Sequence, residues 1–214
     1  MKLALHNYWR SSASYRVRIA LNLKNLPFEY VIVNILKQEQ FTDPYVAKNP
    51  MSQVPTLVMT EDDGTTRILV QSLPILELLD EKFPDPPFLP KTPFERHHTR
   101  VLAEIINSGI QPLQNLKPTG ELKTHGIDVS AWAQRYITAG LTAFAAEADK
   151  SAGKFCVGDH ITLADICLVP QMFSSRRFGV DVAKFPRLLE IEQRCLELPA
   201  FSNAAPDLQP DAVK

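Results

Sequence analysis

Cysteine is scarce in this chain, with three among its 214 residues. The three, Cys156, Cys167 and Cys195, are odd in number, and their spacing does not match a metal-binding motif, so neither a disulfide framework nor a zinc site is indicated. Two of them stand among apolar residues of helical segments. We therefore expect free, buried thiols without a chemical role.

An excess of either charge is also missing. Lysine and arginine together number 23, aspartate and glutamate 24, and the net charge is -1 with a pI near 6.5. Proteins that bind nucleic acid or anionic membranes usually carry a basic stripe or a polybasic segment. The balance of charge therefore argues against both partners and favours a small molecule or another protein.

Long hydrophobic runs are absent as well. No stretch approaches the roughly 18 apolar residues that cross a bilayer. Residues 1–7 become polar too early for a secretory signal. These two absences predict a soluble, cytoplasmic protein.

What the chain does have is a regular alternation of strand and helix patterns up to residue 83. Strands are expected at 2–7, 28–33, 56–59 and 67–70, and helices at 11–24 and 72–82, with a short irregular helical stretch at 42–47. The order βαβ, connecting segment, ββα is that of the thioredoxin fold. The first two strands should be parallel, because a helix crosses between them.

A proline-dense linker at residues 84–91 separates this α/β domain, 1–83, from a second domain at 92–214. Strand patterns vanish there, and long helical patterns follow at 92–116, 128–149, 162–176 and 184–197. The second domain should therefore be all-helical. Pro112 and Pro170 should kink or break their helices, and the polar tail from Pro206 should lack fixed structure.

The most informative segment is the start of the first helix, residues 11–21, which read SSASYRVRIAL. The first turn of a helix leaves N–H groups without internal partners and carries partial positive charge, so an anion is stabilised there. A thiolate is one such anion. An isolated Ser-Ser at this place would be interpreted as a helix cap only.

This run resembles the active-site segment of the zeta-class glutathione transferase and maleylacetoacetate isomerase family. In that family Ser-Ser-Cys is followed by Ser, an aromatic residue and Arg-Val-Arg-Ile-Ala-Leu. The present chain has Ala13 in place of the Cys, so a reactive sulfur would come from bound glutathione. Further matches at 110–116, 169–171 and 176–181 extend the resemblance over nearly the whole chain and imply the glutathione transferase fold.

The resemblance implies that glutathione is the cofactor and that one end of the first domain holds it. Ser11 would donate a hydrogen bond to the thiolate, and Ser12 is the second candidate for this role. Ala13 belongs to the same helix tip and is also expected to contact glutathione. A cis bond between Val54 and Pro55 would turn the Val54 backbone toward the cysteinyl part of glutathione. The remaining positions are Gln71 and Ser72 for the γ-glutamyl end and, more weakly, Gln40 for the glycyl end.

Each of these positions has an ordinary structural alternative. A proline before an edge strand needs no ligand, a serine at a helix start is a common cap, and Gln40 could be a solvated loop residue. Three separated segments nevertheless fall at the places that a glutathione site in this fold requires. Their coincidence favours the glutathione site.

In the second domain, the resemblance places Gln111 and Asn115 toward the glutathione cleft of the same or the partner subunit. Arg177, together with Arg10 of the first domain, would meet carboxylates of the substrate, for which the planar guanidinium fork is suited. Arginines near helix ends also often cap carbonyls or lie in solvent.

The resulting expectation is a homodimeric, glutathione-dependent cis–trans isomerase that converts maleylacetoacetate to fumarylacetoacetate in tyrosine catabolism. The thiolate would add to the double bond of a dicarboxylate, and rotation and expulsion would follow. Alternatives are a maleylpyruvate isomerase, a glutathione transferase acting on α-halo acids, and a non-catalytic interaction module with this fold.

Two further patterns are interpreted as structural. Thr162 and Asp165 match a helix capping box rather than a catalytic pair. Of the five histidines, His97 and His98 lie at the charged beginning of a helix, His125 and His160 flank loops, and His6 has no evident acidic partner. The sequence therefore indicates no general base and no metal site.

Overall fold

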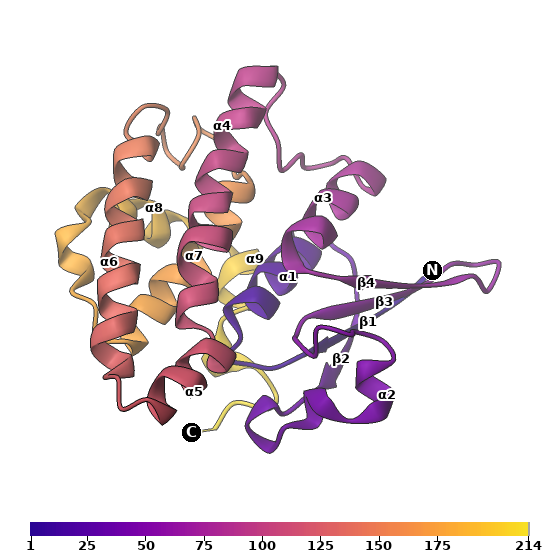
Figure 1. Ribbon diagram of the computed structural model, residues 1–214. Coiled ribbons are helices and arrows are strands. Elements are labelled where there is room, and N and C mark those ends of the chain that lie inside the picture. Colours follow the sequence, from indigo (N-terminus) through magenta and orange to yellow (C-terminus); the bar gives the residue numbers. More distant parts are fainter. Residues whose placement is uncertain (214) are drawn as a thin grey trace. The chain divides into compact units, whose positions relative to one another are not determined.

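A computed structural model describes residues 1–213, which fold into two compact units (Figure 1). The first unit comprises Met1–Pro86 together with residues 199–213, and the second comprises Pro87–Leu198. No helix within residues 1–213 is both long and apolar enough to cross a membrane.

The first unit is built on a mixed four-stranded sheet with the order β2-β1-β3-β4. The strands are β1 (Lys2–Asn7), β2 (Glu29–Ile32), β3 (Thr56–Thr60) and β4 (Thr66–Val70). β1 pairs in parallel with β2 and antiparallel with β3, and β3 and β4 form a hairpin. The thioredoxin-like arrangement and the parallel first pair are therefore confirmed.

Two helices of this unit, α1 (Ser12–Leu23) and α3 (Ser72–Lys82), pack against each other. Figure 1 shows the strands passing between this pair and the short helix α2 (Asp43–Val46), which follows two 3-10 turns, η1 (Ile35–Lys37) and η2 (Glu39–Phe41). Every residue of α1 from Ser14 to Leu21 is buried, including two arginines. α1 is therefore the central element of the unit.

The C-terminal segment belongs to this unit, whereas the sequence had suggested one helical domain from 92 to 214. It contains α9 (Pro199–Ser202) and η6 (Pro206–Leu208). Its carbonyls accept hydrogen bonds from α1: Tyr15 Oη donates to Phe201, Arg18 Nε to Ala204, and Asn22 Nδ2 to Ala200. The expectation that the tail from Pro206 lacks fixed structure is wrong for residues 206–213, because side chains of α1 anchor the segment that leads into it.

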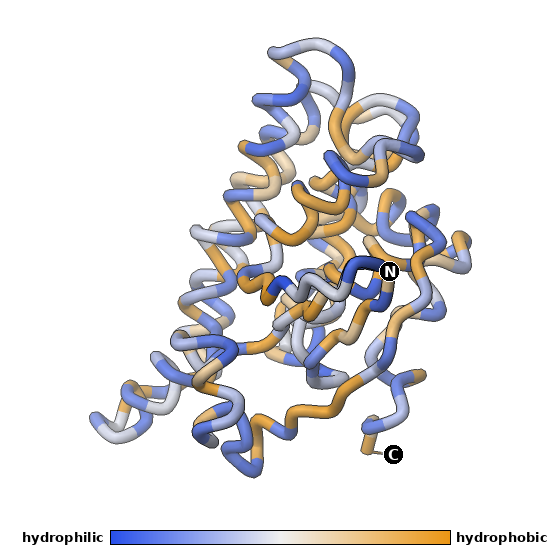
Figure 2. Tube along the Cα trace, turned by 90° about the vertical axis from the view of Figure 1, so that its right-hand side faces the viewer, coloured by the Kyte–Doolittle hydropathy of each residue, from blue (hydrophilic) through white to orange (hydrophobic). Residues whose placement is uncertain are grey.

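The second unit is helical. Its main helices are α4 (Pro93–Glu104), α5 (Leu116–Thr124), α6 (Val129–Ala148), α7 (Leu163–Arg177) and α8 (Pro186–Leu196), with the 3-10 turn η5 (Val182–Lys184) before α8. Hydrophobic and hydrophilic stretches alternate along these helices (Figure 2).

The pattern at 92–116, expected as one helix, is divided. α4 passes into a π-helical turn, η3 (Ile105–Ile110), and then into a 3-10 turn, η4 (Gln111–Gln114), which contains Pro112. The break predicted at Pro112 is thus confirmed, whereas α7 continues through Pro170. A Cβ at Gly140 of α6 would clash with the Ile110 side chain, so glycine permits the close packing of α6 against η3.

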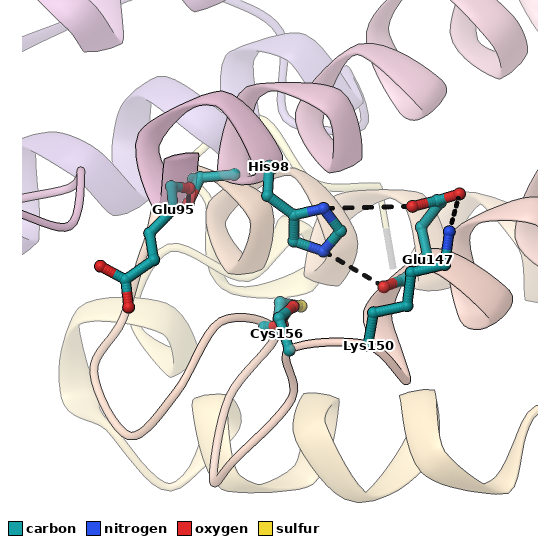
Figure 3. Close-up of polar contacts among 7 residues, drawn as sticks. Glu95, His98, Glu147, Lys150 and Cys156 are labelled. Atoms are coloured by element: carbon teal, nitrogen blue, oxygen red, sulfur yellow. Dashed lines mark hydrogen bonds and ion pairs between the residues drawn. The ribbon is translucent and has the colours of Figure 1, made fainter. Parts of the chain in front are cut away.

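His98 has a structural role. From α4 it contacts the end of α6, where its Nε2 lies 3.2 Å from the Glu147 carbonyl oxygen (Figure 3). Lys150 pairs with the Glu147 carboxylate at 2.6 Å. The imidazole therefore satisfies one of the last carbonyls of α6, which have no intrahelical donor.

The capping box at the start of α7 is confirmed. Asp165 is fully buried, and its carboxylate accepts hydrogen bonds from the backbone N–H groups of Cys156 and Thr162 and from the Thr162 hydroxyl, each at 2.8 Å. Burial raises the pKa of Asp165, and these hydrogen bonds act in the opposite direction. The carboxylate thus joins the 151–162 loop to α7.

We predict that Asp165→Ala lowers the free energy of unfolding by about 3 kcal/mol, because it leaves buried donors without an acceptor. The matched control is Asp128→Ala, which removes an exposed cap of α6 that accepts from Ser130 and Ala131 and should cost about 1 kcal/mol. Urea unfolding followed by circular dichroism measures both. Equal losses would contradict the buried role of Asp165.

Candidate functional site

Three separated segments of the first unit meet at one end of the sheet because of strand register. His6 near the end of β1 pairs with Thr56 at the start of β3, and Thr56 pairs with Val70 at the end of β4. The chain that follows β1, the chain that precedes β3 and the chain that follows β4 therefore lie together. These are the segments of Ser11, of Val54 and of Gln71.

The first segment ends in the N-terminus of α1. Ser11 is the N-cap, and its Oγ accepts from the Ser14 N–H at 3.2 Å. Because Ser11 Oγ serves as acceptor there, its own proton remains available for donation. The helix offers no carbonyl to the amides of Ser12 and Ala13, and its first turn carries no acidic residue.

The second segment is the turn before β3. The Val54–Pro55 peptide bond is cis, as the family resemblance implied. β3 begins at Thr56, so the Val54 backbone stands outside the ladder. The Gln53 carbonyl accepts from Tyr45 Oη at 2.6 Å and from Asn49 Nδ2 at 2.7 Å, which fixes the turn.

The third segment is the start of α3. Gln71 is its N-cap with φ of 67°, a left-handed conformation that is uncommon for a residue other than glycine and is often found at functional sites. Its side chain is exposed and makes no capping bond. The neighbouring Ser72 is buried, and its Oγ accepts from Arg16 Nη1 at 3.1 Å, so α1 holds the start of α3.

Gln40 lies in η2 and is 8% exposed, which argues against a solvated loop residue. Its Oε1 is buried without a hydrogen-bond partner among the described residues. A buried amide oxygen of this kind is costly unless something donates to it. Gln40 could therefore accept a hydrogen bond from a ligand.

Arg10 stands in the loop directly before Ser11. It is half-buried, and its guanidinium lies 5.5 Å from the centroid of the Trp9 ring. The Arg10 charge is thus within the same segment as the helix tip. A cation at this place attracts an anionic ligand.

The other candidates belong to the second unit. Gln111 opens η4 and is half-buried, and Asn115 caps α5 with its Oδ1, which accepts from the Leu116 N–H at 3.0 Å. Arg177 is the last residue of α7; it is exposed and lies 4.5 Å from the centroid of the Phe178 ring. The cap therefore gives Asn115 a structural role in addition to any role in binding.

The three cysteines are buried free thiols in the second unit. Burial raises the pKa of Cys156 and of Cys195, which disfavours their thiolates. The prediction of buried thiols is confirmed, and neither of these two groups is suited to act as a nucleophile.

Sequence reasoning missed the residues that support the site: Arg16, Arg18, Tyr45 and Asn49. Two arginines within a helix whose other buried positions are mostly apolar were a usable signal for the first two. Nothing in the sequence pattern distinguished the second two from surface residues. The assembled site offers free amides, hydroxyls, an unpartnered amide oxygen and a cation, which together fit a small anionic ligand with peptide groups.

Comparisons with known proteins agree with this geometry. Residues 5–87 match the model of the glutathione S-transferase N-terminal domain, and residues 132–199 that of the C-terminal domain. The chain is 43% identical to a maleylacetoacetate isomerase of Dictyostelium discoideum, over 99% of this chain and 96% of the relative. It is 41% identical to a maleylpyruvate isomerase of a Ralstonia species, over 99% and 100%.

A solved structure shows the same fold with ligands. The crystal structure of a maleylacetoacetate isomerase from Anaeromyxobacter dehalogenans 2CP-1 with bound GSH superposes with a TM-score of 0.92 at 46% identity, covering 99% of this chain and 98% of that one. A second crystal structure of that protein holds dicarboxyethyl glutathione and citrate in its active site, with a TM-score of 0.92 at 44% identity and coverage of 100% and 98%.

We predict that Ser72→Ala lowers the free energy of unfolding by about 1–2 kcal/mol, because the buried guanidinium of Arg16 loses an acceptor. Thr60→Ala serves as control, since it removes a hydroxyl that bonds Thr66 at the surface, and it should cost less than about 1 kcal/mol. Denaturant titration compares the two. A Ser72 variant no less stable than the control would show that the contact with Arg16 is dispensable.

Proposed function

The chain belongs to the zeta-class glutathione transferase and maleylacetoacetate isomerase family, and we propose that it isomerises maleylacetoacetate to fumarylacetoacetate with glutathione as cofactor. The observation that carries this proposal is the helix tip at Ser11–Ser12, which lies at the sheet end together with the cis-proline turn and the start of α3. Bound glutathione would supply a thiolate that adds to the cis double bond and leaves after rotation, so that it is not consumed.

The first task of the protein is to favour the thiolate. Ser11 is the preferred donor because its oxygen already accepts from Ser14 and its proton is available. The amides of Ser12 and Ala13 add partial positive charge. Hydrogen bonds to the charged form and a helix N-terminus both lower a thiol pKa.

The second task is to hold the tripeptide. We assign the Val54 backbone, next to Pro55, to the cysteinyl residue. Gln71 and Ser72 at the start of α3 are assigned to the γ-glutamyl carboxylate. Gln40, with its unpartnered amide oxygen, is assigned to the glycyl end.

The third task is to orient the substrate, whose carboxylates suit guanidinium groups. We propose Arg10 of the first unit and Arg177 of the second for this role, with charge stabilisation of the electron-rich transition state as a consequence. Gln111 and Asn115 are proposed to contribute to glutathione binding. A homodimer, a cytoplasmic location and a domain boundary at residues 84–91 stay predictions.

Maleylpyruvate is the second candidate substrate, because the maleylpyruvate isomerase of the Ralstonia species matches this chain over its whole length. Parallel assays with maleylacetoacetate, maleylpyruvate and dichloroacetate at equal glutathione concentration distinguish the isomerases from a transferase acting on α-halo acids. The largest kcat/KM identifies the substrate. Absence of glutathione-dependent turnover on all three would favour a non-catalytic module.

We predict that Ser11→Ala lowers kcat roughly 10- to 100-fold, because a hydrogen-bond donor to the reacting sulfur is lost. The thiol pKa of bound glutathione should rise toward the ordinary value of about 8.5. Ser12→Ala should have a smaller effect, and the double variant should lose retention on immobilised glutathione. Ultraviolet titration of the thiolate and steady-state kinetics measure these changes.

The control is Thr92→Ala, which removes the N-cap of α4 in the other unit. It costs helix stability as Ser11→Ala does but should leave the thiol pKa and kcat unchanged. If Ser11→Ala and Ser12→Ala both keep the wild-type thiol pKa, the assignment of the thiolate to this helix tip fails.

A further inference from the structure

The backbone of Trp9 is held from both sides by charged side chains. Its N–H donates to Asp211 Oδ2 at 3.0 Å, and its carbonyl accepts from Arg18 Nη2 at 3.0 Å. Trp9 stands in the short connection between β1 and α1, two residues before Ser11. Both peptide groups that flank Trp9 are therefore fixed immediately before the helix tip.

Asp211 reaches this loop from the other end of the chain. Its second oxygen, Oδ1, accepts from Tyr30 Oη on β2 at 2.6 Å. Burial raises the pKa of Tyr30, and the hydrogen bond to Asp211 raises it further, so the phenol remains a donor. The carboxylate thus bridges β2 and the Trp9 amide.

Arg18 completes the arrangement. Its guanidinium is 1% exposed and donates from Nε to the Ala204 carbonyl and from Nη1 to Asn7 Oδ1, both at 3.0 Å. Burial lowers the pKa of Arg18 to about 10, so the group remains charged at neutral pH. The C-terminal segment is therefore tied to the loop twice, through Asp211 and through Arg18.

We infer that Asp211 is a positioning residue for the reaction, and that the C-terminal segment sets the place of the Ser11 hydroxyl by holding the Trp9 peptide. This inference rests on the proposed function, because the position of Ser11 matters for activity only if the helix tip holds the thiolate. An error of about 1 Å in such a group can cost a large factor in rate.

The direction in which the thiol pKa of bound glutathione changes when Asp211 is replaced distinguishes a positioning role from a direct electrostatic effect. Through space, a carboxylate disfavours a nearby thiolate, so removing the charge of Asp211 would by itself lower the thiol pKa of bound glutathione. Loss of positioning has the opposite consequence, because donors at the helix tip would meet the sulfur less well. A rise of the thiol pKa in a variant without the charge therefore reports positioning.

The test compares Asp211→Ala, Asp211→Asn and the control Asp207→Ala, which removes an exposed carboxylate from the same segment. Asp211→Ala should raise the thiol pKa of bound glutathione by about one unit and lower kcat/KM about 10-fold. Asp211→Asn should keep the thiol pKa and kcat/KM close to the wild-type values, because its side-chain amide can accept from the Trp9 N–H and donate to the Tyr30 oxygen. Asp207→Ala should match the wild type.

The outcomes distinguish failure of the proposed function from failure of the positioning role of Asp211. A wild-type complex whose thiol is no more acidic than free glutathione would overturn the proposed function. A normal wild type with an unchanged or lowered thiol pKa in Asp211→Ala would overturn the positioning role alone. If Asp211→Ala does not fold, Tyr30→Phe replaces it in the test. A rise of the thiol pKa by less than the one unit expected for Asp211→Ala supports the positioning role, and an unchanged thiol pKa overturns that role.

Discussion

Two buried guanidinium groups of α1 constrain the architecture of the first unit. A buried charge is tolerated only where hydrogen bonds satisfy it. Arg16 finds an acceptor in Ser72 at the start of α3. Arg18 finds its acceptors at the end of β1, in the Trp9 carbonyl and in the C-terminal segment. The same helix whose N-terminus is proposed to bind the thiolate therefore also holds the neighbouring segments in place.

Much of the fold follows from local patterns in the sequence. The helix between the first two strands requires their parallel pairing, and the polar turn at 61–64 marks the β3–β4 hairpin. Once the strand register is added, Ser11, Val54 and Gln71 must lie at one end of the sheet. The capping box at Asp165 was likewise readable, because two side chains at a fixed spacing define it.

Other features left no such pattern. The carbonyls of Ala200, Phe201 and Ala204 anchor the C-terminal segment to α1, and a backbone acceptor has no signature in the residue type that carries it. The bridge from Asp211 to Trp9 joins residues at opposite ends of the chain. The positive φ of Gln71 is equally hidden, because residue type alone favours an ordinary backbone there.

The distribution of carboxylates among the helix starts fits the demand for an anionic ligand. Four helices have an acidic residue at or within their first turn: α2 with Asp43, α4 with Glu95, α6 with Asp128 and α7 with Asp165. Such residues neutralise the positive end of the helix dipole. α1 and α3, which start at the sheet end, have none, and neither do α5, α8 and α9 of the described residues. Ala13 also brings no thiol to the α1 tip. In the proposed glutathione complex, the thiolate and the γ-glutamyl carboxylate would supply one anion for each of the helix starts of α1 and α3.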